Sequence, residues 1–253
     1  MLLNKKGAFT LAEVLITLGI IGVVAVLTVP NIISNYQKKV YVAQLQKGYA
    51  QLQQVFDLAM AEDEVEYLAD TELMQSINGN MIQDDDEQSV FISKLGQYIK
   101  IQKVCSRNYF SDGCHDITYK GLNGDRISNR GYDLQIFTKG GAIYYLRHSF
   151  DKNGWFYSED ECNSTKENGG TLCSLHGFIT IDVNGKKGPN IYGRDLFDFL
   201  VDKKGQLYAY GSISVEGKHD YWLDFIHINH SCTEGYGAGC TGRIMDSGWV
   251  MDY

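Results

Sequence analysis

Hydrophobic residues form one nearly unbroken run near the start of the chain, FTLAEVLITLGIIGVVAVLTV, from Phe9 to Val29. The run has 21 residues, and an α-helix of that length covers about the 30 Å hydrocarbon core of a bilayer. The polar segment that follows offers no small-x-small motif of the kind that ends a cleaved secretory signal. The pattern therefore predicts a membrane-spanning helix over residues 9–30 that stays in the protein.

After Pro30 the continuous run gives way to an amphipathic pattern. Good helix formers resume after the proline, so we expect Pro30 to kink the helix rather than end it, with a continuation over residues 31–62. The stripe could face a coiled-coil partner or the protein's own sheet, and because it is short we expect it to pack on the sheet. Its apolar residues recur at the helical spacings of three and four: Leu45, Tyr49, Leu52, Phe56 and Ala59.

Residues 63–253 are expected to form a globular domain whose pattern changes from helical to extended. The segment 90–105 has the pattern of a short helix that leads to the first cysteine. Short aromatic or β-branched runs with Gly turns then follow at 132–148, 177–188 and 205–215, which predicts an antiparallel sheet. A long helix followed by a strand meander is an α+β arrangement.

The net charge and the sequence motifs limit the classes of function that we expect. The formal net charge is -8, which disfavours a nucleic-acid partner because phosphate binding draws on clustered Lys and Arg. The chain has no GxSxG, no P-loop and no GxGxxG after a predicted strand. Reactive residues that are neighbours in the sequence, such as Cys114-His115-Asp116, are not by that fact arranged as a catalytic site. We therefore do not expect an enzyme.

Six cysteines fall into three local pairs. Each pair closes a short loop, as in disulfides made in an oxidising compartment. Zinc is the rival interpretation, but the spacings are wrong and no CxxC occurs. Disulfides would place the globular domain outside the cytoplasm, which the Lys residues flanking the apolar run do not decide. The expected pairs are Cys105 with Cys114, Cys162 with Cys173, and Cys232 with Cys240.

A Gly-rich loop carries a candidate cation site. Asp182, Asn184, Asn190 and Asp195 space four oxygen-bearing side chains along DVNGKKGPNIYGRD, and Ca²⁺ binds such mixtures of carboxylate and amide oxygens. The order is not that of an EF-hand, because a Gly stands at the fourth position and no Glu closes the loop. The other interpretation, which we favour, is a hairpin turn held by Asx bonds, with Asp195 capping a helix over 194–201. Calcium stays a hypothesis, and no other cofactor is expected.

Glu13 is the one charge inside the apolar run. A carboxylate in a membrane-length helix is costly unless it has a partner, so by default it marks function. The simpler explanation is a carboxylate near a helix start, where the helix dipole favours an anion.

The residues around Glu13 carry a family resemblance. A short basic leader with Lys5 and Lys6, then Phe9 and the apolar run with Glu13, closely resembles the N-terminus of type IV pilins and type II secretion pseudopilins. The resemblance implies that prepilin peptidase removes residues 1–8 by cutting between Ala8 and Phe9, and that Phe9 is then N-methylated. Glu13 becomes fifth in the mature chain, as in the family. Ala8 stands where the family usually has Gly, and a cut one residue earlier would make Glu13 sixth.

The resemblance also implies a pilin fold and a structural role. Glu13 would pair with the N-terminal amine of a neighbouring subunit, while Gly19, Gly22 and Pro30 stand where pilins loosen or bend this helix. The implied partners are other pilin or pseudopilin subunits, prepilin peptidase, the inner-membrane assembly platform and the lipid bilayer. The protein would be a single-pass inner-membrane subunit, assembled into a type II secretion pseudopilus or a type IV pilus. The alternative is a minor tip subunit that binds a secreted protein, a surface or DNA.

Overall fold

The computed structural model describes residues 10–76, 92–106, 114, 117–127, 134–147, 175–211, 232 and 235–253. The chain divides into two compact units between Val40 and Tyr41. Helix α1, Leu11–Glu62, runs through Pro30 without ending there. The other helical elements are short: η1 Leu68–Asp70, α2 Glu72–Gln75, η2 Gly185–Lys187 and α6 Cys240–Asp246.

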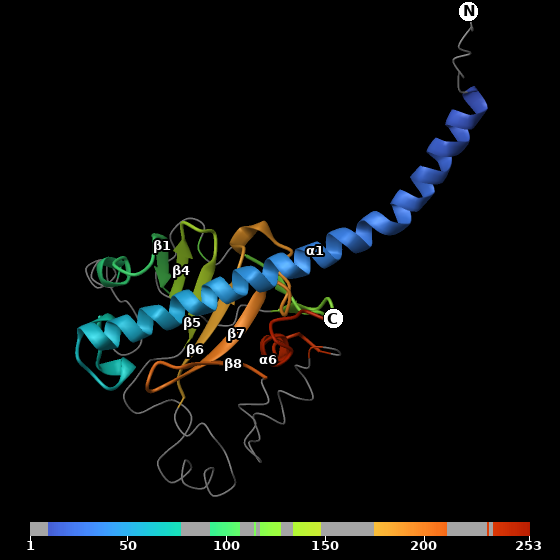
Figure 1. Ribbon diagram of the computed structural model, residues 1–253. Helices are drawn as coiled ribbons and strands as arrows, with labels where there is room; N and C mark the ends of the chain where they lie inside the picture. Colours follow the sequence, from blue (N-terminus) through green and yellow to red (C-terminus); the bar gives the residue numbers. More distant parts are fainter. Residues whose placement is uncertain are drawn as a thin grey trace, which may run out of the picture. The chain divides into compact units, whose positions relative to one another are not determined.

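The second unit is built on a six-stranded antiparallel sheet with the order β1-β4-β5-β6-β7-β8 (Figure 1). Neighbours in the chain are therefore neighbours in most of the sheet, as expected for a meander of hairpins. A separate ribbon pairs β2, Tyr119–Lys120, with β3, Arg126–Ile127. The six strands are β1 Ile101–Ser106, β4 Leu134–Thr138, β5 Ile143–Arg147, β6 Leu175–Asp182, β7 Leu196–Asp202 and β8 Leu207–Ala209.

The second half of α1 covers one face of this sheet (Figure 1). At Gly48 the helix comes so close that a Cβ atom would lie 3.2 Å from Cγ2 of Ile181. Gln53 reaches the edge strand: it accepts a hydrogen bond from the Leu207 N–H at 3.0 Å and donates to the Gly205 carbonyl at 3.1 Å. The predicted stripe is confirmed, because Leu45, Leu52, Phe56 and Ala59 are buried and Tyr49 packs against the same core.

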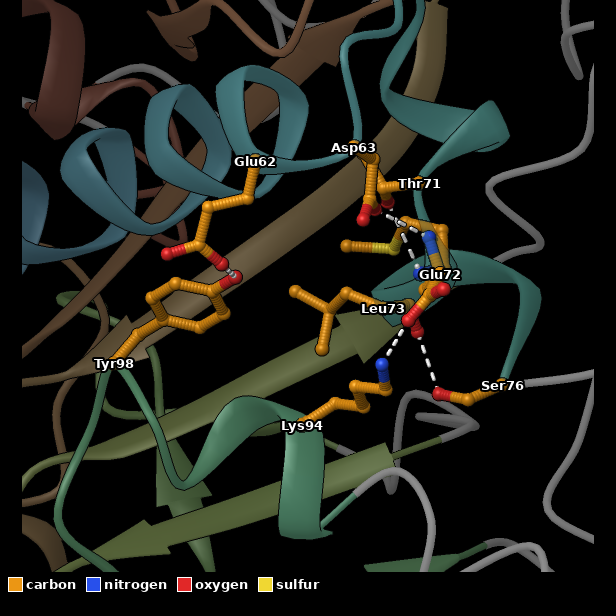
Figure 2. Close-up of polar contacts among 9 residues, drawn as sticks. Glu62, Asp63, Thr71, Glu72, Leu73, Ser76, Lys94 and Tyr98 are labelled. Atoms are coloured by element: carbon orange, nitrogen blue, oxygen red, sulfur yellow. Dashed lines mark hydrogen bonds and ion pairs between the residues drawn. The ribbon is translucent and has the colours of Figure 1, made fainter.

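Polar side chains hold the end of α1 (Figure 2). The Tyr98 hydroxyl donates to the Glu62 carboxylate at 2.5 Å, and the Glu72 N–H donates to Asp63 Oδ2 at 2.6 Å. Lys94 forms an ion pair with Glu72. Burial, together with the hydrogen bond to the charged Glu62, raises the pKa of Tyr98 to about 12. These bonds tie the residues after α1 to the chain that leads into β1.

Two segments that we expected to be helical differ in the structure. Residues 194–201 were expected to be a helix, but the residues from Leu196 to Asp202 form β7 and pair with both β6 and β8. Six of the seven β7 residues are buried, so ladder hydrogen bonds and burial on both faces outweigh the helical pattern. Of the described residues in the segment 90–105, only 92–95 are helical before β1 begins. The α+β architecture itself is confirmed.

The close approach at Gly48 gives a stability prediction. Gly48→Leu should lower the free energy of unfolding by about 1–3 kcal/mol, because the new side chain meets Ile181 where no space exists. Ala50→Leu is the matched control, since Ala50 is exposed on the same helix and its substitution should change stability by about 0.5 kcal/mol or less. Denaturant unfolding of the detergent-solubilised full chain measures both values. Equal effects of the two substitutions would contradict the packing described above.

Candidate functional site: the N-terminal helix and the loop between β6 and β7

The first unit presents apolar side chains to its surroundings. Among the described residues, α1 is the one helix long and apolar enough to cross a membrane. Within this unit the apolar side chains of α1 are exposed, which is the pattern of a helix that contacts lipid or other subunits. The most exposed of them are Leu11, Leu15, Ile16, Leu18, Ile20, Ile21, Val23, Val26, Leu27, Ile32 and Tyr36.

Glu13 belongs to a capping box at the start of α1. Its Oε2 atom accepts hydrogen bonds from the backbone N–H and the hydroxyl of Thr10, each at 2.8 Å, and the Glu13 N–H donates to Thr10 Oγ1 at 3.3 Å. This reciprocal arrangement satisfies donors that a helix N-terminus otherwise leaves free. Glu13 therefore forms its hydrogen bonds within its own helix. Its partner Thr10 could have been identified from the T-x-x-E spacing.

The other predicted residues of this segment fall into two groups. Gly19 and Gly22 lie within α1, and a Cβ atom on either would meet no other atom within 4 Å. Space for close approach by a neighbour is therefore open at both positions. Ala8 and Phe9 lie outside the described residues, so the cleavage site stays a prediction.

Two of the three predicted cysteine pairs are disulfides in the structure. Cys105 at the end of β1 is bonded to Cys114, and Cys232 is bonded to Cys240 at the start of α6. The third pair, Cys162 with Cys173, lies outside the described residues. Disulfides of this kind persist in oxidising compartments.

The loop between β6 and β7 brings the four predicted oxygen-bearing residues together. Asp182 Oδ1 accepts from the Gly185 N–H at 2.7 Å and the Asn184 N–H at 3.2 Å. Asp195 accepts from the N–H groups of Asn190 at 2.8 Å and of Ile191 at 2.7 Å. These are Asx bonds within the turn, as one of the two sequence interpretations expected. Asp195 caps no helix, because the residues after it form β7.

Both carboxylates of this loop are buried. The pKa of Asp182 is raised to about 7, chiefly by burial and also by the nearby charge of Asp195, against hydrogen bonds from Tyr119, Gly185 and Asn184 that lower it. Burial likewise raises the pKa of Asp195, although the N–H groups of Asn190 and Ile191 lower it. Two acidic side chains in mutual repulsion within a buried loop are an uncommon arrangement without a counter-charge.

The Asp182 carboxylate has a partner that sequence inspection missed. The Tyr119 hydroxyl donates to Asp182 Oδ2 at 2.6 Å and lies 2.6 Å from the Tyr145 hydroxyl. Tyr119 belongs to β2, 63 positions before Asp182. No local pattern links positions that far apart in the chain.

Comparison with known proteins bears on the N-terminal segment. Residues 3–29 match the family model described as the prokaryotic N-terminal methylation motif. The chain carries a prepilin-type signal. This signal is that of type IV pilins and pseudopilins, and it supports a pilin-like or pseudopilin-like precursor. The signal belongs to structural pilin-type proteins rather than to a known enzyme class. No curated protein and no solved structure matches the chain.

The prepilin-type signal and the exposed apolar helix agree. The matched residues include Glu13 and the whole apolar run from Phe9 to Val29, and residues 11–29 of the match lie in α1, the helix that could span a membrane. Together they describe a membrane-anchored protein whose signal implies processing by prepilin peptidase and assembly with other pilin subunits.

The hydrogen bond between Tyr119 and Asp182 gives a second stability prediction. Tyr119→Phe should lower the free energy of unfolding by about 1–3 kcal/mol, because it removes a donor from a buried carboxylate. Tyr208→Phe is the control: its hydroxyl reaches Asp202 Oδ2 at 3.4 Å in a partly exposed position, and its loss should cost about 0.5 kcal/mol or less. Chemical denaturation of the full chain distinguishes them, and a neutral Tyr119→Phe would show that the bond contributes nothing.

Proposed function

We propose that this protein is a structural pilin-like subunit that is processed at its N-terminus and assembled into a type II secretion pseudopilus or a type IV pilus. The observation that carries the proposal is the prepilin-type signal on a helix whose first half exposes its apolar side chains. Prepilin peptidase cuts between Ala8 and Phe9, and the new amino group of Phe9 is methylated.

Assembly follows from the surface of α1. In a membrane, helices associate through close packing and polar contacts, because lipid tails are as apolar as the side chains themselves. The open positions at Gly19 and Gly22 allow such packing. Before assembly the first half of α1 holds the subunit in the inner membrane.

Glu13 supplies the polar contact. In the precursor the capping box with Thr10 satisfies the carboxylate within its own helix. Cleavage creates a charged amine on every subunit, and an amine from a neighbour offsets the cost of burying the Glu13 charge. The ion pair fixes the axial register between subunits, which apolar contacts alone do not.

The orientation follows from the disulfides. Cys105–Cys114 and Cys232–Cys240 both lie in the second unit, and such bonds form outside the cytoplasm. That unit is therefore on the far side of the inner membrane from the cytoplasm. The assembly platform and the other subunits act on a protein anchored in this way.

N-terminal processing is the first test. Intact and N-terminal peptide mass spectrometry of the protein from native membranes should find a mature chain that begins with N-methyl-Phe9. A chain that still begins at Met1 would contradict processing, and one that begins at Ala8 would move the cut to follow Gly7. The amount of the protein in sheared filaments then separates a major subunit from a minor tip subunit.

The charge of Glu13 is the second test. Glu13→Gln keeps an oxygen for the capping box but removes the charge, so insertion and cleavage should persist while filament incorporation falls about tenfold or more. Thr10→Ala is the matched control, because it weakens the cap, at a cost of about 1 kcal/mol, and leaves the charge in place. Quantitative immunoblots of sheared filaments and of membranes measure the ratio.

Incorporation of Glu13→Gln at the level of the unsubstituted protein would overturn the ion-pair role. Equal losses for Glu13→Gln and Thr10→Ala would assign the effect to the helix cap instead. Neither result would alter the outcome of the processing test, so cleavage and register are examined separately.

A further inference from the structure

Two side-chain oxygens in the loop between β6 and β7 are buried and accept no hydrogen bond from the described part of the chain. They are Oδ1 of Asn184 and Oδ1 of Asn190. The Asn184 amide is held in place, since its Nδ2 group donates to the Gly188 carbonyl at 2.6 Å. A buried carbonyl oxygen without a partner costs free energy, and native proteins rarely leave one unexplained. Two in one short loop indicate a partner that the chain itself does not supply.

The same loop buries two carboxylates beside these oxygens. Asp182 and Asp195 are both fully buried, and the Asn184 side chain also hydrogen-bonds to Asp195. Among the residues that the structure describes, no Lys or Arg forms an ion pair with either carboxylate. Their hydrogen-bond donors are N–H groups of the turn and the Tyr119 hydroxyl, which are neutral. The loop therefore has a surplus of negative charge and of acceptor oxygens.

We propose that Asp182, Asn184, Asn190 and Asp195 bind a calcium ion. Ca²⁺ takes six to eight oxygen ligands in flexible geometry, and carboxylates with amide carbonyls are its usual protein donors. Mg²⁺ demands a near-ideal octahedron and gives up water reluctantly, whereas zinc prefers nitrogen and sulfur. Backbone carbonyls or water complete the coordination.

The charge of the ion accounts for the burial of the two carboxylates. Asp182 and Asp195 are both buried, and the groups that donate to them among the described residues are neutral. A divalent cation neutralises both side chains at once and also accepts the two amide oxygens as ligands. Two carboxylates give a modest affinity, in the range of about 10⁻⁴–10⁻³ M that calcium-binding extracellular modules show.

The position of the loop explains what a bound ion would stabilise. The Lys120 N–H of β2 donates to the Asn190 carbonyl at 2.9 Å, and the Tyr253 hydroxyl donates to the Gly193 carbonyl at 2.5 Å. A Cβ atom on Gly193 would lie 2.6 Å from Cys240 Sγ. The loop thus joins the β2–β3 ribbon, the C-terminal residue and the α6 disulfide to the main sheet. An ion in the loop would stabilise all of these contacts together.

The test measures both binding and stability of the detergent-solubilised full chain. The melting temperature in about 10 mM Ca²⁺ should exceed that in EDTA by about 3–8 °C, as expected for a dissociation constant between about 0.1 and 1 mM. Mg²⁺ at the same concentration and NaCl at matched ionic strength should give smaller shifts. Tb³⁺ should show emission on tyrosine excitation, because the Tyr119 hydroxyl lies beside Asp182, and Ca²⁺ should suppress that emission.

Substitutions at Asn190 locate the site without removing a buried carboxylate. Asn190 has a left-handed φ of 58°, so Asn190→Gly keeps the backbone conformation while removing one ligand oxygen. It should reduce the calcium-dependent shift by about half or more. Asn190→Asp adds a third carboxylate, so it should lower the melting temperature in EDTA and enlarge the shift in Ca²⁺. Asp202→Asn is the control, because Asp202 makes a comparable turn after β7, accepting from two backbone N–H groups at 2.9 Å.

Equal melting temperatures in Ca²⁺ and EDTA would overturn the proposal, as would terbium emission that Ca²⁺ leaves unchanged. A calcium shift that Asp202→Asn reduces as much as Asn190→Gly does would place the ion elsewhere in the chain. None of these results depends on processing or filament assembly, so the site stands or falls apart from the proposed function.

Discussion

At Gly48 the backbone of α1 approaches Ile181 and Tyr144 on two neighbouring strands, closely enough that a Cβ atom would crowd Ile181 and lie in van der Waals contact with the Tyr144 hydroxyl. A glycine costs helix stability, and here that cost permits the helix to lie close to the sheet. The residues one turn away, Leu45 and Leu52, are then buried completely or nearly so. The helix also protects the sheet's edge through Gln53, which satisfies the backbone of β8 where a free edge would invite pairing with another chain.

The close packing of the second half of α1 contrasts with the exposure of its first half. One continuous helix has its apolar residues covered by the sheet in one unit and exposed in the other. Exposed apolar side chains in the first unit are the pattern of a helix that contacts lipid or other subunits. Because a helix propagates once it is nucleated, the packed half can support an exposed half that would have no tertiary support of its own.

Sequence periodicity was sufficient for the elements whose pattern is local. The stripe from Leu45 to Ala59 and the β4–β5 hairpin follow from spacing and Gly turns alone. Sequence periodicity failed at β7. The run from Leu196 to Val201 is short and mostly apolar, and periodicity alone does not distinguish a buried strand from a helix in such a run. It also missed Tyr119 as a partner of Asp182, since the register that joins β2 to the loop is set by tertiary packing. The oxygen-bearing residues of the loop could be identified from the sequence. Their burial, and the two amide oxygens that accept no hydrogen bond from the described residues, could not.

The two candidate sites share a physical logic. At each one a carboxylate accepts hydrogen bonds from neutral donors among the described residues: Thr10 for Glu13, and turn N–H groups for Asp182 and Asp195. Hydrogen bonds from neutral donors orient a carboxylate without neutralising it. Under the two proposals a cation from outside the chain completes each site: the amine of a neighbouring subunit at Glu13 and a calcium ion in the loop. Both proposals therefore rest on the same physical basis, a carboxylate that its neighbours orient but leave charged.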